Sequence, residues 1–259
     1  MQSRMDWTAA GWSWATAPLR LALECRVGVE WGAMVAAQPV LRRMPQGDGH
    51  AVLVLPYLFG SDLTTQPLRT SLACLGYQAV PAGLGLNLGP RQGLMDAALK
   101  RLLDLRRRSG RPVSLIGWSI GGLYARALAK EAPDAVRLVI TLGTPLNGQP
   151  SPAEMWRLAE QVTGQPFGLS AAHGPLDEPP PVPTTAIFSR TDGIVPWRDS
   201  LQPEGPLSEN IEVESSHFGL GLNPLVGYVI ADRLAQPEGA WQPFRREGLR
   251  ALIYPDQSR

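Results

Sequence analysis

Ser119 lies at the centre of the pentapeptide 117–121, Gly-Trp-Ser-Ile-Gly, a spacing that suits a serine nucleophile. The apolar run 113–116 before it indicates a buried strand, and the run 122–130 after it indicates a helix. A serine on such a tight strand-to-helix turn presents its hydroxyl at the carboxyl end of the strand. The glycines fit this turn because a Cβ there would clash with the neighbouring strand or helix. The alternative is a plain glycine-rich turn.

A serine hydroxyl is a poor nucleophile and needs a general base, and the chain offers three histidines: His50, His173 and His217. The turn resembles that of the α/β-hydrolases, in which the acid and then the histidine follow the serine along the chain, and this resemblance excludes His50. His173 lies in a Gly/Pro-rich stretch with no strand before it. His217 follows the alternating, strand-like run 211–214. We therefore predict His217 as the base; the alternative is a loop or helix-start histidine without a chemical role.

Asp192 is the predicted acid because it comes just after the strand-like run 184–189. In the dipeptide Asp192-Gly193 it could instead only satisfy its own turn backbone. The other carboxylates are placed less well: Asp177 and Glu178 in a proline-rich loop, Asp199 at no strand, and Glu212 and Glu214 inside the last strand. In the predicted mechanism His217 takes the Ser119 proton as the hydroxyl attacks an acyl carbon, and Asp192 orients the imidazole and stabilises the imidazolium.

Two backbone N–H groups are expected to form an oxyanion hole. One is the N–H of Ile120, directly after the nucleophile. The other should come from the loop that follows the apolar strand 51–55, and we predict the N–H of Leu58, with that of Tyr57 as the alternative.

Four stretches together resemble the lipase and esterase branch of the α/β-hydrolases, and most of all bacterial triacylglycerol-lipase-like proteins. They are the strand with Pro56 and Gly60-Ser61-Asp62, the turn 117–121, Leu142-Gly143-Thr144-Pro145, and residues 189–196. The resemblance spans about residues 50–235. It implies an α/β-hydrolase fold, with a mainly parallel twisted sheet flanked by helices, and a serine hydrolase that cleaves carboxylic esters.

Strand-like and helix-like runs alternate along the chain, which independently predicts a mainly parallel sheet with crossover helices. Strands are predicted at 51–55, 77–80, 113–116, 136–141, 184–189 and 211–214, and helices at 62–74, 94–108, 122–130 and 222–234. We expect a helical extension at 1–45 and a hydrolase domain at 46–259, with a cap insertion at about 146–183.

The substrate is expected to be a small ester with an apolar acyl group. The glycine-rich loop 81–93 either lines the acyl pocket or lies at the surface. Candidate pocket residues are Tyr57, Trp118, Leu84, Leu86, Met155 and Trp156.

The first 45 residues carry four of the eight tryptophans and a helix-like stretch at 19–35. Its charged residues, Arg20, Glu24, Arg26 and Glu30, are predicted to form a solvent-facing stripe. We expect this segment to pack against the main domain or a second subunit of a homodimer. Peripheral contact with a membrane surface is the alternative.

Composition indicates one soluble domain, since 44% of the 259 residues are hydrophobic and 18% are charged. The net charge of +1 argues against a nucleic-acid partner. No cofactor or metal is expected, because Cys25 and Cys74 form no ligand motif. We predict them to be buried free thiols, with a disulfide between them as the alternative. No apolar run suits a transmembrane span and no secretion signal stands out, so we expect a cytoplasmic protein.

Two other functions remain open at this level. An acyltransferase would form the same acyl-enzyme but pass the acyl group to an alcohol or thiol. A binding protein would keep the hydrolase shell without catalysis.

Overall fold

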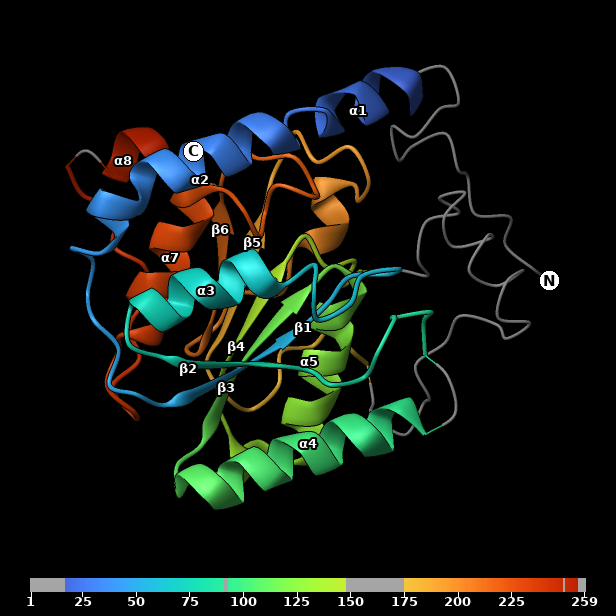
Figure 1. The fold of residues 1–259 in the computed structure, drawn as a ribbon, viewed down its shortest axis with the longest axis vertical. Helices are drawn as coiled ribbons and strands as arrows, with labels where there is room; N and C mark the ends of the chain where they lie inside the picture. Colours follow the sequence, from blue (N-terminus) through green and yellow to red (C-terminus); the bar gives the residue numbers. More distant parts are fainter. Residues whose placement is uncertain (1–16, 91–92, 148–174, 249, 256–259) are drawn as a thin grey trace.

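The computed structural model describes residues 17–90, 93–147, 175–248 and 250–255. A six-stranded parallel sheet forms its centre, in the order β2-β1-β3-β4-β5-β6 (Figure 1). The strands are β1 Ala51–Leu55, β2 Gln78–Pro81, β3 Val113–Trp118, β4 Val136–Leu142, β5 Thr184–Phe188 and β6 Ser208–Glu212. The predicted parallel α/β sheet is confirmed.

Helices cover both faces of this sheet (Figure 1). Helices α3 and α7 pack on one face, and α4 and α5 pack on the other. The helices are α1 Ala17–Glu24, α2 Val27–Leu41, α3 Gln66–Cys74, α4 Leu94–Ser109, α5 Ile120–Glu131, α7 Pro224–Leu234 and α8 Arg250–Ile253. Two short 3₁₀ helices, η2 Pro133–Ala135 and η4 Trp197–Ser200, complete the described elements.

The central strands are readable from sequence because both of their faces are covered. Every residue of β1, β3, β4 and β5 is buried, and strands buried on both faces carry continuous apolar runs. Within β1, Val52 and Val54 belong to the core under α3 and α7, whereas Leu53 and Leu55 belong to the core under α4 and α5. Consecutive residues thus supply two separate cores.

The last strand begins earlier than its apolar residues predict. Ser208, Glu209 and Asn210 belong to β6 although their side chains are polar. Each of these side chains is buried and hydrogen-bonded: the Asn210 amide, for example, donates to the Gln202 carbonyl at 2.9 Å. A satisfied polar strand carries no apolar pattern, so only its last two residues fall within the predicted run.

Helices α1 and α2 lie outside the two layers, with α2 packed against α7 (Figure 1). The prediction that their charged residues face solvent is wrong, because Glu24 is buried and Glu30 is half-buried against the loops that follow β5 and β6. The prediction of buried thiols is also wrong, since Cys25 and Cys74 are free and exposed. None of the described helices has the length and apolar character needed to cross a membrane.

Candidate active site

Ser119 connects β3 directly to α5 in a backbone conformation that is rare for a side-chain-bearing residue. Its φ is 53° and its ψ is −123°, and such conformations cost of order 1–3 kcal/mol and gather at functional sites. Its N–H donates to the carbonyl of Leu142 on β4 at 2.8 Å, and its own carbonyl accepts from Gly122 at 2.9 Å. The turn therefore holds the serine at the carboxyl edge of the sheet.

The glycines around Ser119 are required by close backbone approach. A Cβ on Gly117 would overlap the backbone of Gly121 and Gly122, and one on Gly121 would overlap the carbonyls of Leu55 and Pro56. These neighbours are main-chain atoms, which cannot swing aside. The predicted reason for the glycines is confirmed.

Asp192 and His217 form a buried hydrogen-bonded pair. The His217 Nδ1 lies 2.7 Å from the Asp192 Oδ2, and each side chain is 2% exposed. The other carboxylate oxygen, Oδ1, accepts from the N–H groups of Ile194 at 2.8 Å and Val195 at 2.7 Å. Asp192 thus satisfies its own turn with one oxygen and bonds the imidazole with the other. The pairing through Nδ1 leaves Nε2 for a partner on the other side of the ring.

Two contacts bring the histidine to the serine turn. The indole Nε1 of Trp118 donates to the carbonyl of His217 at 3.0 Å. Gly143 follows the Leu142 carbonyl that holds Ser119, and a Cβ on it would lie 3.0 Å from the Asp192 Oδ2 and 3.1 Å from the His217 Nδ1. The ends of β3, β4, β5 and β6 thereby converge at one sheet edge, where ligands bind in open parallel sheets.

The pKa of His217 is raised above its ordinary value. Burial alone lowers this pKa, because it disfavours the imidazolium. The charge and hydrogen bond of Asp192, and then the charge of Glu24, outweigh burial and favour the protonated ring. Such a histidine is suited to accept a proton from a hydroxyl.

The predicted oxyanion groups are free to donate. Within the described part of the chain, neither the N–H of Leu58 nor that of Ile120 makes a hydrogen bond. Ile120 is the first residue of α5, where the helix dipole favours negative charge. In the loop after β1 the positive φ falls on Phe59, at 61°, and Tyr57 has no such conformation.

Asn87 fixes that loop, a role that sequence reasoning did not find. Its backbone N–H donates to the Gly60 carbonyl at 2.8 Å, and its own carbonyl accepts from the Phe59 N–H at 2.7 Å. Its side-chain amide donates to Pro56 at 2.8 Å and its Oδ1 accepts from the Tyr124 hydroxyl at 3.2 Å. The available signal was an asparagine inside an apolar, glycine-rich stretch.

The predicted pocket residues differ in placement. Tyr57 is half-buried, and its ring packs edge-on against Trp118 at 4.8 Å between ring centroids. The Trp118 side chain is buried and packs within the hydrophobic core. Leu84 is half-buried beside the α4–α5 core, and Leu86 is 49% exposed. Met155, Trp156 and His173 lie outside the described residues, as does most of the cap insertion.

A second Ser-His-Asp arrangement occurs at the opposite edge of the sheet. The His50 Nε2 lies 2.8 Å from the Ser114 Oγ, and its Nδ1 lies 2.5 Å from the Asp48 Oδ1. Ser114 is fully buried within β3, and Asp48 also pairs with Arg111 and Arg137. Burial lowers the pKa of His50, the opposite of the direction at His217. Ser114 and His50 are both buried, as expected of a structural network.

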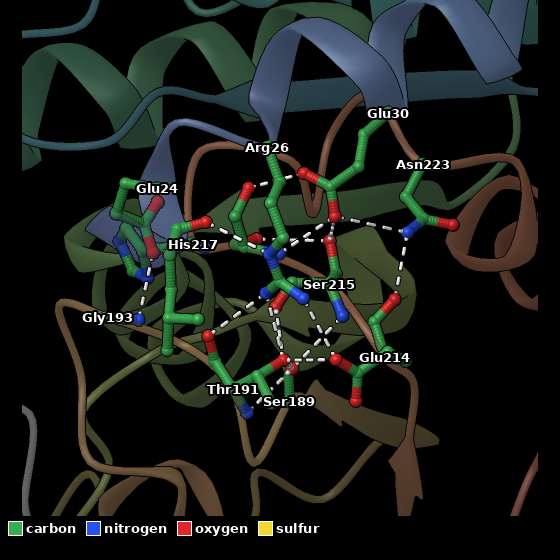
Figure 2. Close-up of polar contacts among 12 residues, drawn as sticks. Glu24, Arg26, Glu30, Ser189, Thr191, Gly193, Glu214, Ser215, His217 and Asn223 are labelled. Atoms are coloured by element: carbon green, nitrogen blue, oxygen red, sulfur yellow. Dashed lines mark hydrogen bonds and ion pairs between the residues drawn. The ribbon is translucent and has the colours of Figure 1, made fainter. Parts of the chain in front are cut away.

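Three charged residues of the N-terminal segment reach two loops (Figure 2): the acid loop, residues 189–195 after β5, which carries Asp192, and the base loop, residues 213–218 after β6, which carries His217. The Arg26 guanidinium donates to the Thr191 carbonyl at 3.2 Å and to Glu214 at 2.9 Å. Glu24 and Glu30 accept hydrogen bonds from residues 193 and 215–218. The sequence predicted these three side chains to face solvent, because oppositely charged residues follow one another there at close helical spacing.

Residues 80–175 match the family model described as a PGAP1-like alpha/beta domain. Comparison with curated protein sequences gives no significant match. Solved structures that resemble the chain include lipase B of Aspergillus fumigatus, at 18% identity and a TM-score of 0.57, covering 74% of this chain and 54% of that one. This chain therefore spans about half the length of that lipase.

Shorter proteins are covered more completely. An alpha/beta superfamily hydrolase of Oenococcus oeni is 16% identical, with a TM-score of 0.53, and the match covers 73% of this chain and 94% of that one. The thioesterase domain from the curacin biosynthetic pathway is 14% identical, with a TM-score of 0.51 and coverage of 74% and 93%. At these identities the likeness concerns the fold alone.

Proposed function

This chain has the α/β-hydrolase fold, and we propose that it is a serine hydrolase that cleaves carboxylic esters through an acyl-enzyme on Ser119. His217 takes the proton of the attacking hydroxyl through Nε2 and returns it to the leaving alcohol. Asp192 holds the imidazole through Nδ1 and stabilises its charge. Water then attacks the acyl-enzyme. The observation that carries the proposal is the Asp192–His217 hydrogen bond at the same sheet edge as a serine with positive φ.

The N–H groups of Leu58 and Ile120 bind the oxyanion of the tetrahedral intermediate in this proposal. Their lack of other acceptors among the described residues supports it, because each is free to donate. Loss of one such donor typically costs about 10²–10³-fold in kcat. Two structures that share the fold are named a lipase and a thioesterase domain, which fits acyl chemistry.

The proposed substrate is a small ester with an apolar acyl group. Leu58 and Leu84 give the loops above the sheet edge an apolar character, which supports this substrate. A series of p-nitrophenyl esters of increasing acyl length, run with the native chain and Ser119→Ala, tests both parts. We expect activity with the native chain and its loss in the variant. Undiminished turnover by Ser119→Ala would remove this serine from the mechanism.

A further inference from the structure

The carboxylate of Glu24, at the end of α1, ties the acid loop to the base loop. Its Oε1 accepts from the N–H of Gly193 at 2.8 Å and from the N–H of His217 at 2.9 Å (Figure 2). Its Oε2 accepts from the N–H of Phe218 at 3.0 Å. Gly193 directly follows Asp192. One side chain from the N-terminal segment therefore holds the backbone beside both members of the Asp192–His217 pair.

The close packing of α1 on the acid loop shows that this contact is built into the fold. Gly193 lies so close to the Arg20 carbonyl and to the Glu24 Oε1 that a Cβ would overlap both. Glu24 is 8% exposed, so its three hydrogen bonds replace those that water would make. Charged hydrogen bonds in such surroundings are about twice as strong as neutral ones.

We propose that Glu24 is a positioning residue that sets the geometry of Asp192 and His217, an inference that rests on the proposed function of that pair. It touches no reacting atom. It fixes the two backbone segments from which the acid and the base must meet, and displacement of a reacting group by about 1 Å can cost about 10²-fold in rate.

The charge of Glu24 gives the proposal a separate readout. The charged groups that act on the His217 imidazole are Asp192 from the loop after β5 and Glu24 from α1. The Phe218 ring, which contacts the imidazole, carries no charge. Neither does Trp118, whose indole bonds to the His217 carbonyl. Since Glu24 raises the pKa of His217, neutralising it lowers that pKa.

Glu24→Gln tests this role because it keeps the size and removes the charge. We expect kcat/KM to fall by about tenfold to 10²-fold, mainly in kcat, and the acidic limb of the pH profile to move to lower pH. Glu24→Asp keeps the charge but shortens the reach, so activity should fall with a smaller movement of the limb. This variant also decides the question if Glu24→Gln does not fold.

Glu30→Gln is the matched control. Glu30 also belongs to the N-terminal helices, and it accepts from the Ser215 hydroxyl at 2.9 Å and the Ser216 N–H at 2.8 Å, but not from His217. We expect this variant to leave the acidic limb in place. Native kcat/KM and an unmoved limb in folded Glu24→Gln, with Ser119→Ala inactive, would overturn the positioning role. Activity in Ser119→Ala would instead overturn the proposed function.

The outward side of the same helices carries a second proposal, from a different observation. Six large apolar side chains on α1 and α2 are 55–75% exposed: Leu19, Leu21, Val29, Trp31, Val35 and Val40. The polar residues of α2 turn inward, Glu30 to the base loop and Gln38 to Ser71. Met34 and Leu41 of α2 are buried as well, so α2 is apolar around most of its surface, while its two polar side chains turn toward the protein.

The charged residues around the exposed apolar face of α1 and α2 indicate what kind of partner binds there. The two acidic residues of α1 and α2, Glu24 and Glu30, are hydrogen-bonded to the rest of the protein. Arg42 and Arg43, just after α2, are exposed. An apolar helix face with a tryptophan and a basic margin suits the interface of an anionic membrane. At 15 residues α2 is too short to span a bilayer, which takes about 20. We infer that α1 and α2 lie on an anionic phospholipid surface.

Flotation of the full chain with vesicles tests this inference. We expect binding to vesicles that contain phosphatidylglycerol, weaker binding to phosphatidylcholine alone, and weakening by salt. Replacing Val29 and Trp31 together by serine should abolish binding, and replacing Arg42 and Arg43 by glutamine should weaken it. The matched control is Leu207→Ser, an exposed leucine just before β6.

These face variants should keep native turnover of a soluble ester, since none of the residues belongs to the proposed catalytic machinery. Absence of flotation, or equal flotation by the double-serine variant, would overturn the lipid proposal. So would a dimer in sedimentation that the double-serine variant converts to a monomer, because a second copy would then cover the face.

Discussion

The indole Nε1 of Trp118 donates a hydrogen bond to the carbonyl of His217 at 3.0 Å. Trp118 directly precedes the serine, so the end of β3 holds the main chain of the base. Residues 99 positions apart are thus joined by one bond within the core. The tryptophan of the pentapeptide therefore helps to hold the main chain of His217 next to the serine turn.

Replacing Trp118 by phenylalanine should weaken both stability and activity. The His217 carbonyl would lose its partner, which typically costs about 1–3 kcal/mol for a buried group. We expect kcat/KM to fall further than stability alone explains, because the base loop loses a fixed point. Chemical denaturation and ester kinetics measure the two effects. The control is Tyr254→Phe, which removes the 3.0 Å hydroxyl bond to the Leu225 carbonyl away from the site and should change stability only.

The acidic limb of the kcat/KM profile should lie above pH 6.5, the ordinary pKa of histidine. His217 must be neutral to accept a proton, and Asp192 and Glu24 raise its pKa despite burial. Activity is therefore lost as pH falls through this raised value, and the profile of the free enzyme reports it. Initial rates on a soluble ester across pH give the measurement. A limb below pH 6.5 would contradict the assignment of His217 or the raised pKa.

Gly121→Ala should be among the most damaging small substitutions in the chain. Its Cβ would overlap the carbonyls of Leu55 and Pro56, which belong to the β1 backbone and the loop of the proposed oxyanion donor. We expect a loss of about 1–3 kcal/mol or more in stability, together with most of the activity. Gly28→Ala is the matched control: it lies in α2, and apart from its chain neighbours and its own helix backbone no atom of the described residues lies within 4 Å of the added Cβ. That variant should gain about 0.5–1 kcal/mol and keep its activity.

Sequence predicted the sheet, and it indicated three candidate site residues, because each leaves a strong local pattern. Ser119 lies in a glycine-bound turn between apolar strand and helix, and Asp192 and His217 each follow a strand. The N-terminal segment was misread, because Glu24 and Glu30 bond to loops nearly two hundred positions away. A charge pattern shows that a residue needs a polar partner. It does not show whether that partner is water or a distant N–H group.

The loop after β1 illustrates the same limit. An asparagine among glycines predicts a turn, and Asn87 does sit in an irregular segment. Its four hydrogen bonds to the 56–60 loop and to Tyr124 join segments that follow β1 and β2 to α5. Local pattern therefore predicts elements well, whereas bonds between elements follow only from the packed structure.

Two serines of β3 and its turn allow a final test of which Ser-His-Asp arrangement acts on substrate. Ser114→Ala removes the 2.8 Å contact with the His50 Nε2 inside the buried network. We expect a stability loss of about 1–3 kcal/mol, because the imidazole keeps an unpaired nitrogen, with native kcat in the folded enzyme. Ser119→Ala should leave stability nearly unchanged and abolish turnover, since no described residue depends on its hydroxyl for a hydrogen bond. Thermal unfolding and single-turnover ester cleavage separate the two. The reverse pattern, with turnover lost at Ser114 and kept at Ser119, would move the chemistry to the opposite edge of the sheet.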